Sequence, residues 1–199
     1  MLKTKPANRR VHRNTYTQSQ SVMNWVVTVG SVIFCLLLLP MRIPGMELLG
    51  IAPNWLLIWV VAWSIRRTAI LGAIAGLVLG LIQDGMTSPN PTHVISLVVV
   101  GVLSARLQKQ RYLQEDFISV ALIVFGMTIL AELIATVQFS FHSYNTLGTN
   151  TFTLGKLVEI WQHHQQVALT SAIVTSLWAP IIYYPLNHWW ARAKVLHSS

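Results

Sequence analysis

The feature that most constrains this chain is a series of long apolar stretches without a single Asp, Glu, Lys or Arg. They occupy residues 14–41, 48–65, 68–83, 85–105, 133–155 and 160–191. About 20 apolar residues in a helix are enough to cross the hydrocarbon core of a bilayer. Only 10% of the chain is charged, against about a quarter of a typical soluble domain. The chain is therefore expected to be an all-α integral membrane protein.

Loop signals divide these stretches into a bundle of about six expected transmembrane helices. Pro40 ends the first helix, because proline cannot continue the helical hydrogen-bond ladder. The run Ser88-Pro89-Asn90-Pro91 is a loop signal after the third, and Pro180 predicts a kink in the sixth. The spans are expected at residues 22–39, 52–65, 68–83, 93–105, 117–139 and 167–184. Residues 140–166 are expected to form an external loop with a short helix around Gly155–His164.

The positions of the basic residues predict how the bundle is oriented. We expect a disordered basic cytoplasmic tail, a six-helix transmembrane domain and a cytoplasmic C-terminal tail, at residues 1–20, 21–185 and 186–199. With the N-terminus inside, the cytoplasmic segments hold 12 of the 14 Lys and Arg residues, and the external loops hold only Arg42 and Lys156. Because Lys and Arg concentrate in cytoplasmic loops, both termini are expected in the cytoplasm. This pattern explains the net charge of +8 without a nucleic-acid partner.

Catalytic and metal-binding motifs are missing from the sequence. It contains no GxSxG, HExxH, CxxC, P-loop or GxGxxG pattern. The six acidic residues are dispersed, with no obvious pair inside a span. The adjacent His163 and His164 would point about 100° apart on a helix, which is a poor geometry for holding a metal ion. We therefore expect no enzyme activity, no metal and no cofactor.

Two acidic residues are candidates for a structural role in the membrane. Glu132 lies fifteen residues into the fifth expected span, where a charge costs about 2.5–3.5 kcal/mol. It is expected to bind another helix or a ligand, unless it is protonated or hydrated near the outer surface. For the helix tie, the partners by chemistry are Asn54, Gln83 and the Ser and Thr residues of the sixth span. Asp84 ends the third span, either as a hydrogen-bonding hub of a hairpin or as a loop acid at the interface.

Three glycines are spaced four residues apart in the third span. Gly72, Gly76 and Gly80 therefore line one face of the helix. Small residues on one face let two helix backbones approach closely. We expect this face to pack against another helix, either inside this chain or from a partner protein.

Three tryptophans are also spaced four residues apart, in the second span. Trp55, Trp59 and Trp63 share one helix face. Tryptophan is enriched at membrane interfaces, so this stripe is expected to face lipid. The alternative is a docking surface for another membrane helix.

The central part of the sequence resembles the rod shape-determining protein MreD family. The resemblance rests on three segments, namely Ala52-Pro53-Asn54-Trp55-Leu56-Leu57, the hairpin with Arg66-Arg67, and Gly76-Leu77-Val78-Leu79-Gly80-Leu81-Ile82-Gln83-Asp84-Gly85. In size, span order and topology it covers residues 22–185. The family often has a Leu-Gly step after the Asp, whereas this chain has Ser88-Pro89-Asn90-Pro91-Thr92-His93, as expected of a divergent member.

The resemblance implies a membrane scaffold in the inner membrane of a bacterium. Proteins of this family bind the single-span partner MreC in the complex that links MreB filaments to RodA and a penicillin-binding protein. The chain would then take part in cell-shape determination. The family also looks similar in fold to the substrate-binding subunits of energy-coupling-factor transporters. The alternative function is therefore that of a membrane subunit that binds a small molecule such as a vitamin.

Overall fold

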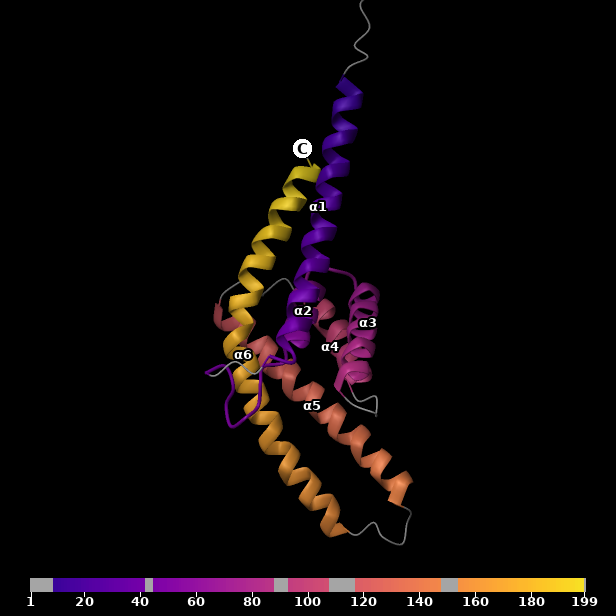
Figure 1. Cartoon of the computed structure of the whole chain (residues 1–199), viewed down its shortest axis with the longest axis vertical. Helices are drawn as coiled ribbons and strands as arrows, with labels where there is room; N and C mark the ends of the chain where they lie inside the picture. Colours follow the sequence, from indigo (N-terminus) through magenta and orange to yellow (C-terminus); the bar gives the residue numbers. More distant parts are fainter. Residues whose placement is uncertain (1–8, 42–44, 88–92, 108–116, 148–153, 199) are drawn as a thin grey trace, which may run out of the picture.

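The computed structural model describes residues 9–41, 45–87, 93–107, 117–147 and 154–198, and in this part of the chain the regular elements are helices. They are arranged as shown in Figure 1. In chain order they are α1 (Arg9–Leu38), α2 (Trp55–Ser64), α3 (Ala69–Thr87), α4 (His93–Leu107), α5 (Phe117–Leu147) and α6 (Leu154–Ser198). The expected all-helical fold is thus confirmed.

Three of the helices are long and apolar enough to cross a membrane. The segments that qualify are Ala69–Met86 in α3, Phe117–Phe141 in α5 and His164–Trp190 in α6. The apolar parts of the other three, Val22–Leu38, Trp55–Ser64 and His93–Leu107, are shorter. These lengths and compositions fit a membrane protein, and the number of six spans stays a prediction.

The shortest helix, α2, lies at the centre of the fold. Every one of its ten residues except Trp63 is buried, and it contacts α1, α3, α4, α5 and α6. A helix that is hydrophobic on all sides is typical of such a central position. Asn54 sets its start, since the side-chain oxygen accepts a hydrogen bond from the Leu57 N–H at 3.1 Å. This N-cap satisfies a donor that the first turn of a helix otherwise leaves unpaired.

Three helices are longer than the expected spans. α1 begins at Arg9, so the basic segment expected to be disordered is helical from that residue onward. α5 continues to Leu147, and α6 is one helix from Leu154 to Ser198 in place of a short helix followed by a span. For α1 and α5 the physical reason is the lack of helix-breaking residues, because α1 contains one glycine and no proline and α5 ends just before Gly148. The division into tail, membrane domain and tail stays a prediction.

α5 and α6 form a long pair that extends away from the other four helices at one end of the molecule (Figure 1). At the opposite end, the Arg9 end of α1 and the Ser198 end of α6 lie on the same side (Figure 1). Pro180 and Pro185 lie within the helix α6.

Candidate functional site

The glycine face of α3 lies directly against α4. A side-chain carbon added at Gly80 would lie 2.6 Å from Val94 Cα, and one added at Gly76 would lie 2.8 Å from Val98 Cα. These distances are shorter than any normal carbon–carbon contact. Gly72 is packed in the same way against the backbone of Gly101. The two backbones are therefore in direct contact over about two helical turns of α3, from Gly72 to Gly80.

The partner glycine in α4, Gly101, was missed in the sequence. A carbon added to it would meet the carbonyl group of Gly72. A signal was present, since Ser104 and Ala105 lie three and four residues further on, and residues at this spacing share one helix face. By contrast, a carbon added at Gly126 in α5 would meet no atom within 4 Å. The close approach is thus specific to the α3–α4 seam, which we define as Gly72, Gly76, Gly80 and Gly101.

Asp84 closes one end of the seam. Its carboxylate accepts hydrogen bonds from the His93 N–H at 2.9 Å and from the Val94 N–H at 3.1 Å. His93 Nδ1 also lies 2.8 Å from Asp84 Oδ1. The N–H groups of a first helical turn have no partner within the helix, and a carboxylate there also interacts favourably with the helix dipole. The structure therefore places Asp84 in a hydrogen-bonded cap on α4, with only 6% of its surface exposed.

Glu132 joins α5 to α6. The Ser171 hydroxyl of α6 donates to Glu132 Oε1 at 3.3 Å. Ser171 is buried and Glu132 is half-buried. Of the partners that the sequence offered for Glu132, the structure brings a serine of the sixth span to it.

Two of the three tryptophans of the α2 stripe, Trp55 and Trp59, do not face lipid, whereas Trp63 is half-buried. Trp55 is 4% exposed and Trp59 is 3% exposed, because α2 is surrounded by the other helices. Trp59 Nε1 donates to Ser31 Oγ of α1 at 2.9 Å, and its ring meets Trp190 of α6 edge to face at 6.5 Å. The expectation of a lipid-facing stripe is corrected, and Trp55 and Trp59 are equally unavailable as a docking surface.

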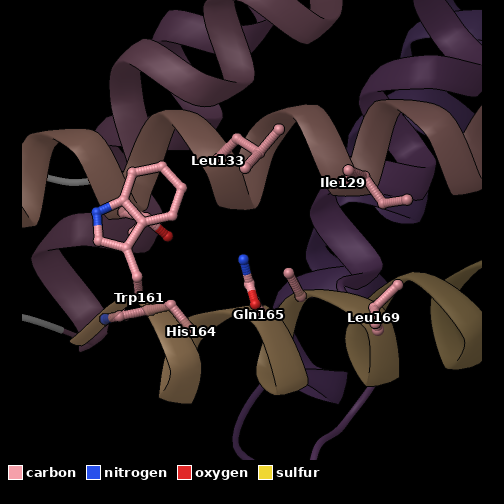
Figure 2. A pocket seen from close by; sticks show the side chains of 8 residues that line it. Ile129, Leu133, Trp161, His164, Gln165 and Leu169 are labelled. Carbon is pink, nitrogen blue, oxygen red and sulfur yellow. The ribbon is translucent and has the colours of Figure 1, made fainter. Parts of the chain in front are cut away.

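A cavity of about 220 Å³ lies between α5 and α6. Figure 2 shows it as the space enclosed by side chains from both helices. Its lining consists of Ile129, Leu133 and Thr136 from α5 and Trp161, His164, Gln165, Ala168 and Leu169 from α6. Sequence reasoning did not single out this site, since its residues come from two distant segments.

Asp84 and Glu132 hold neighbouring helices together through their carboxyl groups. No group of three or more His, Cys, Asp or Glu that could hold a metal ion occurs among the described residues. Asp84 and Glu132 each bind groups of a neighbouring helix, and the free thiol of Cys35 is buried. This arrangement fixes how helices pack against each other.

The fold and these contacts define a small helical membrane protein that is held together by a glycine seam and by polar ties between helices. A family model described as rod shape-determining protein MreD matches residues 19–185. The chain belongs to the MreD family, as the sequence resemblance implied. No curated protein and no solved structure matches the chain.

Membership connects the chain with the determination of rod shape. The family is one of membrane-associated, shape-determining proteins and is not a known enzyme family. The family belongs to the rod-shape complex. The match covers all six helices at least in part, so the helix seam and both polar ties lie within it.

Proposed function

We propose that this chain is a scaffold of the bacterial cell-elongation complex, embedded in the plasma membrane. It would link an MreC-like single-span protein and MreB to the wall-synthesis proteins RodA and a penicillin-binding protein. The family match over residues 19–185 is the observation that carries this proposal. The use of Asp84 and Glu132 in helix packing supports a role without chemistry of its own.

We further propose six membrane spans with both termini in the cytoplasm. The support is the placement of 12 of the 14 Lys and Arg residues in the segments that are then cytoplasmic. The shared side of the Arg9 and Ser198 helix ends agrees with an even number of crossings (Figure 1). α2, whose ten residues span only about 15 Å, is surrounded by protein, and its neighbours supply the rest of the membrane thickness.

Co-purification tests the scaffold function. The affinity-tagged chain is extracted in a mild detergent from its own organism and probed for the MreC-like protein. We expect the MreC-like protein to be retained by the native chain and by Gly126→Leu, and to be lost with Gly76→Leu. The reason is that leucine at Gly76 forces α3 away from α4, whereas Gly126 has open space around it. Equal retention by both variants, or no retention by the native chain, would contradict the proposal.

The second candidate function is a substrate-binding subunit of a small-molecule transporter. The cavity between α5 and α6 is the observation that favours it. At about 220 Å³, however, it is smaller than the roughly 300–1,000 Å³ of typical small-molecule sites. Recovery of ATPase subunits in the same co-purification would favour the transporter over the scaffold.

A further inference from the structure

The cavity between α5 and α6 crosses the boundary of the membrane-spanning segments. Its α6 lining begins before the apolar segment His164–Trp190 and continues into it. From Trp161 to Leu169 the helix rises by about 12 Å, which approaches the roughly 15 Å thickness of one leaflet's hydrocarbon region. The cavity thus extends from the level of lipid head groups toward the level of acyl chains.

One side of the cavity is open to the surroundings of the helix pair. Leu133 is 41% exposed and Leu169 is 54% exposed, whereas Ala168 between the helices is 8% exposed. Leu133 and Leu169 lie within apolar segments that are long enough to cross a membrane, so with the proposed six spans the medium they meet is hydrocarbon. An acyl chain can therefore enter the cavity sideways from the bilayer, with Ala168 at its base.

The polarity of the lining changes along the cavity. Figure 2 shows Trp161 and His164 at one end, Leu169 and Ile129 at the other, and Gln165 directed into the space between the helices. Indole, imidazole and amide groups can donate hydrogen bonds to phosphate oxygens, and tryptophan is enriched at the level of lipid head groups. An amphiphile fits this order, with its head near Trp161 and its chain near Ile129.

The cavity lining contains one imidazole, that of His164, and no Lys, Arg, Asp or Glu. The nearest carboxyl group in sequence, that of Glu132, accepts a hydrogen bond from Ser171. His164 also contacts the ring of Phe139, with ring centroids 5.7 Å apart, so its position at the polar end is fixed by packing.

We propose that this cavity binds one acyl chain of a phospholipid, with the phosphate head group beside His164 and Gln165. Because the cavity holds only about 220 Å³, part of one acyl chain would lie in it and brace the helix pair, while the rest of the phospholipid would stay in the bilayer. The site is separate from the glycine seam of α3 and α4.

Photolabelling in a bilayer tests the proposal. The full chain is reconstituted into vesicles of phosphatidylethanolamine and phosphatidylglycerol that contain a phosphatidylglycerol with a diazirine on its acyl chain. Labelled residues are mapped by mass spectrometry. We expect labelling of Leu133 and Leu169 to exceed that of Leu122 and Leu177 by about tenfold. A tenfold ratio corresponds to a preference of about 1.4 kcal/mol for the cavity over the general lipid surface. The controls lie on the same helices and are more exposed, at 68% and 66%.

Cavity-filling variants separate a site from general lipid contact. Ala168→Phe places a ring in the cavity and should reduce labelling of Leu169 about tenfold, to the level of Leu177. Leu133→Trp fills the same space from an exposed position, and it keeps the test valid if Ala168→Phe does not fold. Leu177→Phe is the matched control and should change nothing. Even labelling of all exposed leucines, full labelling in both filled variants, or displacement of the probe by glycerol phosphate would overturn the proposal.

Discussion

At the scale of single residues, several polar groups inside the bundle connect one helix to another. Asn54 caps α2 with its side chain, and its backbone N–H donates to the Thr175 hydroxyl of α6 at 3.0 Å. Trp59 and Ser31 connect α2 to α1 in a similar way. A buried polar group without a partner costs about 1–3 kcal/mol. Each of these pairs therefore favours one arrangement of the helices over others.

The first prediction concerns the tie between Glu132 and Ser171. Glu132→Gln keeps an oxygen that can accept from the Ser171 hydroxyl, so it should retain most stability and function. Glu132→Leu leaves that buried hydroxyl without its partner and should cost about 1–2 kcal/mol. The measurements are the thermal stability of the purified protein in detergent and complementation of a shape-defective strain.

The charge of Glu132 is tested by the same pair of variants. If Glu132→Gln is as defective as Glu132→Leu, the carboxyl group acts through its charge and the role as a neutral tie is wrong. Ser171→Ala serves as the control from the other side, because it removes the same hydrogen bond. It should lower stability about as much as Glu132→Leu does.

The second prediction compares two glycine-to-alanine changes. Gly76→Ala puts a methyl group against the backbone of Leu97 and Val98 in α4, and overpacking of this kind costs about 1–3 kcal/mol. Gly126→Ala meets no atom within 4 Å and should stabilise α5 by up to about 1 kcal/mol through helix propensity. Thermal unfolding of both variants in the same detergent checks the difference. Equal melting temperatures would show that the seam tolerates separation of its helices.

At the scale of elements, α3 and α4 form one hairpin, in which different residues set the helix spacing and the start of the second helix. The glycines set the distance between the helices, and Asp84 sets where α4 begins. Ser96 adds a further local bond, since its hydroxyl donates to the carbonyl of His93 at 2.9 Å. The hairpin therefore combines close packing along its length with a polar lock at one end.

The third prediction concerns this lock. Asp84→Leu removes every acceptor from the first turn of α4 and should destabilise the hairpin by about 1–2 kcal/mol, the usual cost of losing a cap. Asp84→Asn keeps one oxygen and should cost less. Gly85→Ala is the adjacent control, because a carbon there meets no atom within 4 Å. Hydrogen exchange at the amides of His93 and Val94 measures the effect directly, and unchanged protection in Asp84→Leu would contradict it.

The sequence predicted the packing face of α3, but it did not predict what the α2 face meets or how long α5 is. The spacing of Gly72, Gly76 and Gly80 identified a packing face because only small residues permit backbone contact. The direction of the α2 face could not be found in this way, since lipid and protein interior are equally apolar and hydrophobicity does not distinguish them. The length of α5 had the same limit, because residues 140–147 are polar but contain no glycine or proline that would end the helix.

At the scale of the whole molecule, the helices differ in what surrounds them. α2 is enclosed by its neighbours, whereas only a third of the apolar segment of α3 is buried in the chain. The segment of α5 is 28% buried and that of α6 is 50% buried. The outer helices therefore present large apolar surfaces that need lipid or a protein partner, which is the property expected of a membrane scaffold.

The last prediction tests the proposed orientation by cysteine accessibility. The chain has a single cysteine, and it is buried, so Cys35→Ala supplies a background without thiols. In that background Gln162→Cys should react with a membrane-impermeant maleimide in intact spheroplasts, because residues 140–166 are external when both termini lie in the cytoplasm. Thr68→Cys and Ser198→Cys should react only after the membrane is permeabilised. Both Gln162 and Thr68 are exposed, so a lack of reaction reports the side of the membrane and not burial in the protein. The reverse pattern would invert the topology, and reaction of Thr68→Cys and Ser198→Cys from opposite sides would rule out an even number of crossings between them.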